Sequence, residues 1–270
     1  MQPSQPPSGL SAATVLESPS PGILTTPDDL CGHAAADCPD HALPPPPALT
    51  IERNGYLVRI ANGCDPLQRQ TAALVERMYA ARGLIPYGVH VTPPDGRDLI
   101  VAALRNGHAA ATLTLRMDCG AGLLADALYH DEIDAVRQRG ARVSEITRLA
   151  IAPDAASYDA LAGLLQALYT LAQLTGHMSD IFIEVHPRHA RFHQRVFGFR
   201  LAGEERICPR VGAPAVLLHL SRQAFEAALA GRGPSRMPLR ARRARRVDRL
   251  LPSEEEFRKF RQLLNPSPAG

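Results

Sequence analysis

Apolar residues recur at helical spacing in several segments of the chain. After Pro66, a residue suited to the first turn of a helix, Leu67, Leu74 and Met78 share one face and predict a helix over residues 66–82. Further helices are predicted over residues 123–139, 158–175 and 187–197, the last two ending at Gly176 and Gly198.

Runs of β-branched and aliphatic residues between turn residues predict strands. Residues 99–104 and 110–117 form the clearest pair, because Asn106-Gly107 between them is a strong hairpin signal. The continuous run over residues 181–185 predicts a buried central strand. Strands are also predicted over residues 56–60, 143–151, 199–208 and 215–220. Strands and helices alternate along most of the chain, so we expect an α/β fold in which helices cover both faces of a mixed sheet.

The two ends of the chain differ in composition from the middle. Residues 1–50 contain 11 of the 24 prolines, five acidic residues and no Lys or Arg, which predicts a disordered Pro-rich head. Residues 51–230 are expected to form the folded domain. Residues 231–270 contain 11 basic and 4 acidic residues, and a capping-box start predicts a terminal helix over residues 253–264. The formal net charge of +3 therefore combines an acidic head, a nearly neutral body and a basic tail.

Several classes of protein are disfavoured by the sequence. No basic stretch followed by an apolar segment begins the chain, so no secretory signal is visible. The most apolar segment, residues 161–174, is interrupted by Gln166 and Gln173 and is too short to span a bilayer. Five scattered cysteines do not form a disulfide framework. We therefore expect a soluble cytoplasmic protein with reduced thiols.

Two segments of the second half carry motifs that belong together. In residues 144–151, the pattern Glu145-x-Thr147-Arg148 resembles the Glu-x-Ser/Thr-Arg/Lys motif of two GNAT-like groups, the N-acyl amino acid synthases and the acyl-homoserine-lactone synthases. Residues 186–199 contain His-Pro-Arg-His, then Phe192, then a Gly-Phe turn, and this pattern is closer to the N-acyl amino acid synthases. The homoserine-lactone alternative is weaker, because the chain contains no Trp and lacks the N-terminal pattern of that group.

The resemblance covers residues 55–222 and implies both a fold and an activity. The implied fold is a GNAT-like mixed, mostly antiparallel sheet flanked by helices. The implied enzyme is an N-acyltransferase that joins a long-chain acyl group to the α-amine of an amino acid, with no bound cofactor. His186 stands where the family more usually has Asn.

One loop departs from the acetyl-CoA-using members of the superfamily. Those members cradle the CoA pyrophosphate in a Gly-rich loop at a helix start, where backbone N–H groups bind the anion. The matching residues 152–159 contain no glycine, no cation and two acids, Asp154 and Asp159. A phosphopantetheine-linked acyl donor on an acyl carrier protein fits better, and the resemblance implies the same donor.

Glu145 is the candidate catalytic base of amide formation. A strand carboxylate in a cleft can take the proton of an ammonium, directly or through water. Period-two alternation would place Glu145 among Val143, Thr147, Leu149 and Ile151, an otherwise apolar stripe that raises the pKa of an acid. The alternative is a structural carboxylate paired with an arginine of the first helix.

The remaining candidate site residues would bind substrates. Alternation places Arg148 on the opposite face with Ile146 and Ala150, where it would bind the acceptor's carboxylate or anchor an internal ion pair. The fold resemblance implies that backbone N–H groups near residues 149–151 stabilise the oxyanion. The full set of expected substrate-binding residues is Thr147, Arg148, Leu149, Ala150, Ile151, His186, Arg188, His189 and Phe192.

Three further patterns have a structural and a functional interpretation. His186, His189 and His193 would bind a metal or, more simply, cap a helix and line the pantetheine groove. The pattern Cys31, His33, Cys38, His41 also has ligand types at short spacing, in a segment without a fold to hold them. Leucines of the helix over residues 158–175 would form core, or in part the wall of a lipid tunnel. They are Leu161, Leu164, Leu165, Leu168 and Leu171.

The basic tail indicates an anionic partner, which charge alone does not identify. Its arginines Arg240, Arg242, Arg243, Arg245 and Arg246 would dock an acidic acyl carrier protein, contact anionic lipid at a membrane surface, or stay solvated. Nucleic acid is disfavoured, because no aromatic residues interleave with these arginines.

Three functions follow from these observations. The first is transfer of an acyl group from acyl carrier protein to an amino acid. The second is an acyl-CoA-dependent N-acyltransferase of small amines. The third is a non-catalytic module that binds acyl chains or acyl carrier protein.

Overall fold

The computed structural model describes residues 49–229, apart from residues 92–93, 119 and 156–157. The expected head and tail, with their cysteines, arginines and terminal helix, lie outside the described residues, so the domain boundaries remain predictions. The described helices are α1 (Asp65–Ala80), α2 (Asp126–Arg137), α3 (Tyr158–Thr175), α4 (Pro187–Phe197) and α5 (Arg222–Leu229). The strands are β1 (Thr50–Arg53), β2 (Tyr56–Ile60), β3 (Asp98–Arg105), β4 (His108–Met117), β5 (Val143–Ile151), β6 (Asp180–Val185), β7 (Arg200–Cys208) and β8 (Ala213–Ser221).

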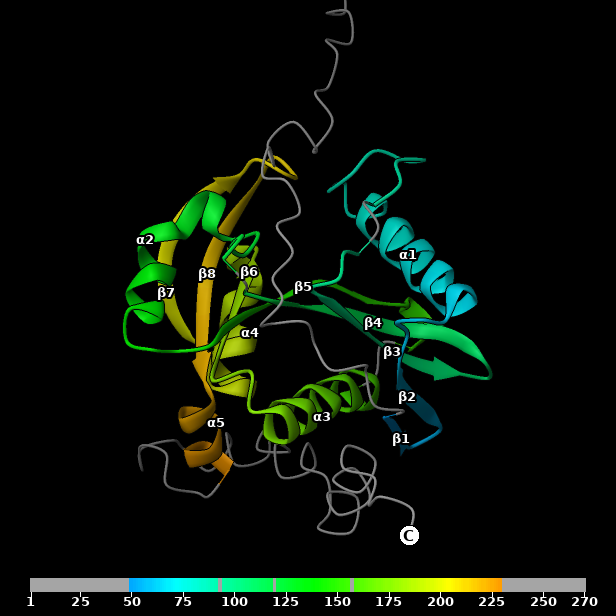
Figure 1. Cartoon of the computed structure of the whole chain (residues 1–270). Coiled ribbons are helices and arrows are strands. Elements are labelled where there is room, and N and C mark those ends of the chain that lie inside the picture. Colours follow the sequence, from blue (N-terminus) through cyan, green and yellow to red (C-terminus); the bar gives the residue numbers. More distant parts are fainter. Residues whose placement is uncertain (1–48, 92–93, 119, 156–157, 230–270) are drawn as a thin grey trace, which may run out of the picture. The chain divides into compact units, whose positions relative to one another are not determined.

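The strands form one sheet in the order β1-β2-β3-β4-β5-β6-β8-β7. Neighbouring strands are antiparallel except β5 and β6, which run parallel. Helices α1 and α2 lie on one face of the sheet, and α3, α4 and α5 lie on the other (Figure 1). The predicted α/β class and the GNAT-like arrangement of a mostly antiparallel sheet between helices are confirmed.

Turn chemistry explains both hairpins at the N-terminal end of the sheet. Asn106 and Gly107 have φ angles of 52° and 79°, the left-handed values that a tight two-residue turn requires. Asn54 and Gly55, with φ angles of 44° and 81°, join β1 to β2 in the same way. Strand β1 was not predicted, although its Asn-Gly turn carries the same signal as the hairpin that was. Helix α5 was not predicted either.

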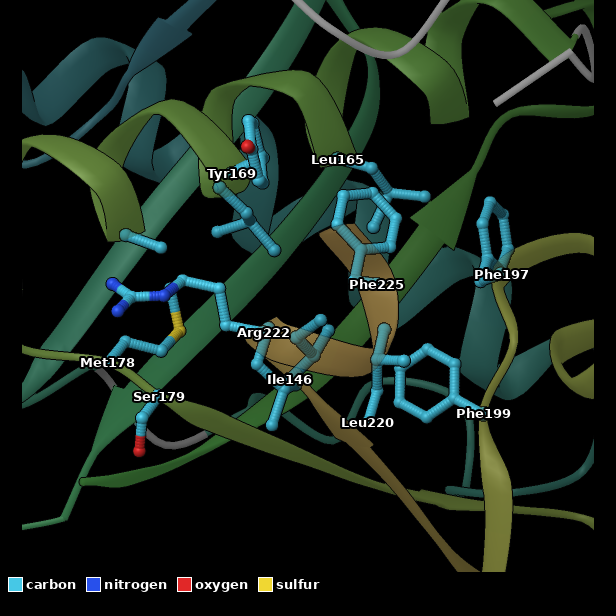
Figure 2. A pocket seen from close by; sticks show the side chains of 13 residues that line it. Ile146, Leu165, Tyr169, Met178, Ser179, Phe197, Phe199, Leu220, Arg222 and Phe225 are labelled. Carbon is cyan, nitrogen blue, oxygen red and sulfur yellow. The ribbon is translucent and has the colours of Figure 1, made fainter. Parts of the chain in front are cut away.

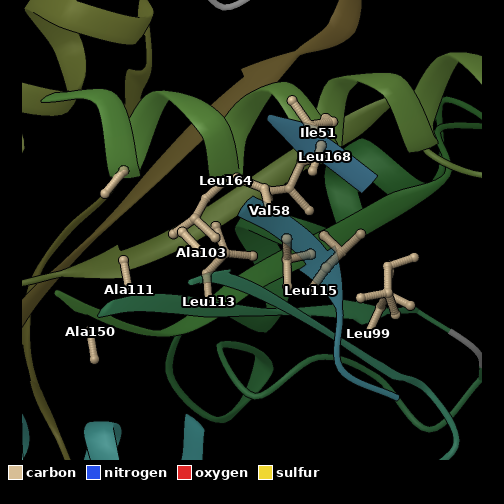
Figure 3. Packing of buried hydrophobic residues seen from close by; sticks show 14 of the residues in the cluster. Ile51, Val58, Leu99, Ala103, Ala111, Leu113, Leu115, Ala150, Leu164 and Leu168 are labelled. Atoms are coloured by element: carbon tan, nitrogen blue, oxygen red, sulfur yellow. The ribbon is translucent and has the colours of Figure 1, made fainter. Parts of the chain in front are cut away.

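The largest core lies between α3 and the strands β1 to β4. Leu164 and Leu168 of α3 point at Val58, Leu113 and neighbouring apolar side chains of the sheet (Figure 3). Both leucines are 2% exposed or less. Most of the leucine stripe predicted on this helix is therefore core. None of the helices in the described residues combines the length and the apolarity needed to cross a bilayer.

Strand β5 carries an irregularity that sets the geometry of the site. Thr147 pairs with Thr114 and Ala150 pairs with Thr112, so β5 has one residue more than β4 between these pairs. Arg148 takes up the extra residue with a left-handed φ of 51°. The pairing of β5 with β6 ends at Ile146 and Ile183, although both strands continue. The two strands therefore separate beyond Ile146.

This bulge corrects the predicted faces of β5. Glu145, Thr147 and Ala150 oppose Arg116, Thr114 and Thr112, which alternate regularly on one face of β4. Leu149 and Ile151 instead pack with Ile146 on the α3 side. The predicted stripe from Val143 to Ile151 was wrong beyond Thr147, because the inserted residue reverses the alternation.

Candidate active site

Glu145 is a buried carboxylate held by backbone N–H groups. Its side chain lies under the segment that leads into α2, and Ala125 N–H donates to its Oε2 over 3.1 Å. Glu145 is 1% exposed, and this burial raises its pKa to about 7, against the opposing effects of Arg210 and of the N–H groups of Ala125 and Leu124. The raised pKa agrees with the desolvation expected for this position. Among described residues, the contacts of Glu145 come from this segment and not from an arginine of α1.

A second buried acid and its counter-ion lie beside Glu145. Glu184 of β6 accepts from Arg210 Nη2 over 2.9 Å, and Arg210 Nη1 donates to the Leu124 carbonyl over 2.7 Å. The thiol of Cys208 also contacts Glu184, and burial raises its pKa to about 11. The sequence analysis did not find Glu184 or Arg210. They lie 39 and 65 positions from Glu145, so no local pattern connects them.

Arg148 projects from the bulge toward α1. Its electrostatic neighbours are Tyr79 of α1 and the pair Asp98–Arg116, and burial lowers its pKa. Asp98 is bound by Arg116 through two contacts of 2.8 Å. In the described residues Arg148 makes no hydrogen bond or ion pair. The internal ion pair expected of Arg148 is therefore not found there, because Asp98 is already paired with Arg116. Arg148 and Glu145 do not contact one another.

The second motif, residues 186–199, begins where β6 leads into α4. His186 caps α4 by accepting from the N–H of Arg188 over 3.2 Å, so the capping interpretation is confirmed. Arg188 Nε lies 3.1 Å from His189 Nε2. Phe192 is 45% exposed, and its ring edge contacts Phe197. These residues lie at the end of β6 toward which β5 and β6 separate.

The histidines of α4 differ in environment. Burial lowers the pKa of His193 to about 4, and it lowers the pKa of His189 as well. His193 packs against the rings of Phe197 and Phe199. No group of three His, Cys, Asp or Glu side chains in the described part of the chain could hold a metal ion.

The loop that would face a CoA pyrophosphate remains acidic. Residues Pro153–Ala155 form a short 3-10 turn in which Asp154 is exposed. Asp159, in the first turn of α3, is paired with Arg53 of β1 over 3.7 Å. Asp154 is an exposed acid that forms no ion pair with any residue the structure describes, which disfavours a bound pyrophosphate at this position.

An apolar pocket, partly open to solvent, lies on the α3 face of the sheet (Figure 2). Ile146, the residue after Glu145, lines it. Met178, Ser179 and the Arg222 side chain lie at one end, and Phe197 and Phe199 lie at the other. The remaining lining residues are Leu165, Leu168, Tyr169, Ala172, Ile181, Leu220 and Phe225. Two of the five predicted tunnel leucines therefore reach the pocket.

Comparisons with known proteins agree with this architecture. The family model described as "N-acyl amino acid synthase FeeM" matches residues 70–221. The solved structure of FeeM, an N-acyl amino acid synthase from uncultured soil microbes, is 20% identical, has a TM-score of 0.55, and covers 65% of this chain and 95% of its own.

Two homoserine-lactone synthases are also similar. The AHL synthase LasI is 14% identical with a TM-score of 0.46, covering 68% of this chain and 98% of its own. MesI, a CoA-dependent acyl-homoserine lactone synthase, is 18% identical with a TM-score of 0.45, covering 64% of this chain and 90% of its own. The sequence matches no curated protein. The match to the family model spans more than half of the chain, which therefore belongs to the FeeM family of N-acyl amino acid synthases, acyltransferases with a GNAT-like fold.

Proposed function

We propose that this N-acyltransferase joins a long acyl chain, delivered as a phosphopantetheine thioester on an acyl carrier protein, to the α-amine of an amino acid. One observation carries the proposal. A buried carboxylate with a pKa of about 7, Glu145, and an apolar pocket lined by the adjacent Ile146 lie on opposite faces of the sheet, at the last pairs of β5 and β6 before the two strands separate. A base and an acyl site are the two elements that N-acylation by a thioester requires.

Glu145 takes the proton of the attacking amine. A base whose pKa lies near the working pH combines adequate ionisation with adequate basicity. The amine nitrogen forms a bond to the thioester carbonyl carbon, the C–S bond breaks, and the pantetheine thiol leaves with a proton. The carbonyl oxygen carries the transient negative charge. The donors proposed for it are backbone N–H groups near residues 149–151, of which those of Leu149 and Ile151 point away from β4 by the alternation of the strand.

Each substrate has a place in this arrangement. The separated ends of β5 and β6, with Arg188, His189 and Phe192 at the corner of α4, would receive the pantetheine arm. The acyl chain would pass Ile146 into the apolar pocket. Arg148 would bind the acceptor's carboxylate, because its buried guanidinium makes no ion pair with described residues. Thr147 lies between base and guanidinium along the strand.

Two features favour a carrier-protein donor over free acyl-CoA. Asp154 is an exposed acid where a pyrophosphate would bind. The arginines from Arg240 to Arg246 supply a positive charge that an acidic carrier protein would match, although they lie outside the described residues. Contact with a membrane surface through the same arginines and a cytoplasmic location remain predictions.

The test compares two donors under identical conditions. The purified full-length protein is incubated with a palmitoyl carrier protein or with palmitoyl-CoA, each with all twenty amino acids, and mass spectrometry identifies the products. We expect N-acyl amino acids with the carrier protein and at least tenfold less with palmitoyl-CoA.

Glu145→Gln is the matched variant, with Gln138→Glu on the exposed end of α2 as a control. Loss of a general base is expected to lower turnover by about 10² to 10⁴-fold. Equal rates with the two donors would contradict the carrier-protein donor and favour an acyl-CoA-dependent enzyme. Undiminished turnover by Glu145→Gln would contradict the assignment of Glu145 as the general base. Binding of acyl carrier protein without any product would indicate a non-catalytic binding module.

A further inference from the structure

Arg210 is presented by a stiff turn between β7 and β8. Pro209 precedes it, and the N–H groups of Val211 and Gly212 both donate to the carbonyl of Cys208. Gly212 has a φ of 60°, which closes the turn at little steric cost. The guanidinium is therefore placed by the backbone rather than by a long flexible loop.

One of the two contacts of Arg210 fixes the peptide group that holds Glu145. The Leu124 carbonyl, which accepts from Arg210, and the Ala125 N–H, which donates to Glu145, belong to the same peptide unit. Because a peptide unit is planar, fixing its carbonyl also fixes the direction of its N–H. Arg210, the peptide and Glu145 thus form a continuous chain of hydrogen bonds, in which each bond polarises the next.

The residues that flank the Leu124–Ala125 peptide make further contacts. Leu123 N–H donates to Asp126 over 2.6 Å, and Asp126 is bound by Arg137. These contacts secure the start of α2. The Leu124 carbonyl itself accepts from two donors, the Ala127 N–H over 3.4 Å and Arg210 Nη1 over 2.7 Å, so Arg210 makes the shorter contact. We infer that Arg210 is a positioning residue for Glu145, which it acts on through the Leu124–Ala125 peptide, and that Glu184 holds Arg210 in place for this purpose. This inference rests on the proposed role of Glu145.

The charges of the pair act on Glu145 in opposite directions. Arg210 lowers the pKa of Glu145 and Glu184 raises it. The other titratable groups on the elements packed here are Cys208 of β7, Tyr129 of α2 and Arg116 of β4. Arg116 is engaged by Asp98, and the pKa values of Cys208 and Tyr129 are raised to about 11 and about 12, so these two stay neutral near pH 7.

The inference is tested on the full-length enzyme with two neutralising variants. In Arg210→Gln the pKa of Glu145 should rise, and the acidic limb of the kcat/KM–pH profile should move up by about one pH unit. In Glu184→Gln the same limb should move down. Arg210→Lys keeps the charge but not the two-pronged contact, so it should leave the limb in place while kcat falls.

Arg206→Gln is the matched control. Arg206 also extends from β7 to α2, where it contacts the Leu128 carbonyl and Glu132, away from Glu145. A general loss of packing in the β7–β8 hairpin would affect this variant too. Arg206→Gln should nevertheless leave the acidic limb of the kcat/KM–pH profile in place. Identical limbs in Arg210→Gln, Arg206→Gln and the unaltered enzyme would overturn the inference.

A second readout does not depend on turnover. The amide resonance of Ala125 in a ¹⁵N-labelled protein should titrate with Glu145, with a midpoint that rises in Arg210→Gln and falls in Glu184→Gln. An unaltered midpoint in both variants overturns the positioning role even if the enzyme is active. Shifted midpoints in a protein that makes no N-acyl amino acid, or in which Glu145→Gln is fully active, would support the coupling and contradict the proposed function.

Discussion

Glu145 is an unusual carboxylate because its hydrogen-bond donors among the described residues are neutral backbone N–H groups, while the cation Arg210 that acts on it is itself bound to Glu184. A fully buried acid is costly to ionise, so its pKa moves toward neutrality. The motif around Glu145 identified the residue from sequence. The surroundings that give the carboxylate its pKa come from the segment before α2, from β6 and from the β7–β8 turn, which only the fold brings together.

The raised pKa of Glu145 predicts how the stability of the protein depends on pH. Between the unfolded value near 4.5 and the folded value of about 7, the folded state binds the additional proton. The contribution of Glu145 to the free energy of unfolding should therefore fall as pH rises across this window, by about 3 kcal/mol in total. The lowered pKa of His193 contributes a rise over an overlapping range, so the Glu145 contribution is measured as the difference between the unaltered protein and Glu145→Gln. Urea unfolding of both proteins at pH 4.5, 6 and 8 measures this difference, and a difference that does not change with pH would contradict the buried acid.

Arg148 provides a test of acceptor binding. Arg148→Met should raise the KM for the amino acid at least tenfold, because a charge-assisted contact is lost, and should leave the KM for the acyl donor unchanged. Arg59→Met, an exposed arginine on β2, serves as the control. A variant whose two KM values rise together would indicate a structural role for Arg148.

At the scale of elements, the local sequence pattern predicted the bounds of helices and strands better than it predicted which face of the sheet each side chain occupies. Tyr158–Thr175 and Val143–Ile151 have the predicted bounds, because periodicity and turn residues act within a few positions. The bulge in β5 has no such signal. The residue with the left-handed φ is Arg148. A Gly or Asn at this position would have indicated an irregular backbone from the sequence. The orientation of the site residues beyond Thr147 therefore needed the structure.

The packing of α3 on the sheet is open to a stability measurement. Leu164→Ala should lower the free energy of unfolding by about 2–5 kcal/mol, because it leaves a cavity beneath the helix. Leu201→Ala on β7, where the leucine is 56% exposed, should change it by less than about 0.5 kcal/mol. Chemical denaturation at a single pH distinguishes them, and similar losses would contradict the described core.

Helix α5 closes one wall of the apolar pocket. Phe225 packs against Tyr169 of α3 with ring centroids 5.3 Å apart. Phe225→Ala should enlarge the pocket and shift the N-acyl products toward longer chains when mixed acyl donors compete, as read by mass spectrometry. Leu201→Ala, which removes an exposed apolar side chain outside the pocket, is the control. An unchanged product distribution in Phe225→Ala would place the acyl chain elsewhere.

For the molecule as a whole, the sheet separates two chemical environments. The acid and its hydrogen bonds lie on the α1 and α2 face. The apolar pocket lies on the α3 face (Figure 2). The sequence predicted both components, the carboxylate from its motif and the leucine wall from its periodicity. It could not place them on opposite faces, because that depends on how β5 and β6 pair over distances of some 35 residues.

The gap between β5 and β6 has a consequence for how the reaction ends. In the proposed reaction, a finished N-acyl amino acid would have its polar head on the Glu145 face of the sheet and its acyl tail in the pocket on the α3 face. If the product leaves by the way the acyl chain entered, the tail is drawn back past Ile146, and each withdrawn methylene gives up about 0.8 kcal/mol of apolar burial. Departure should therefore become the slow step as chains lengthen, so that the enzyme turns over its best-bound substrates most slowly.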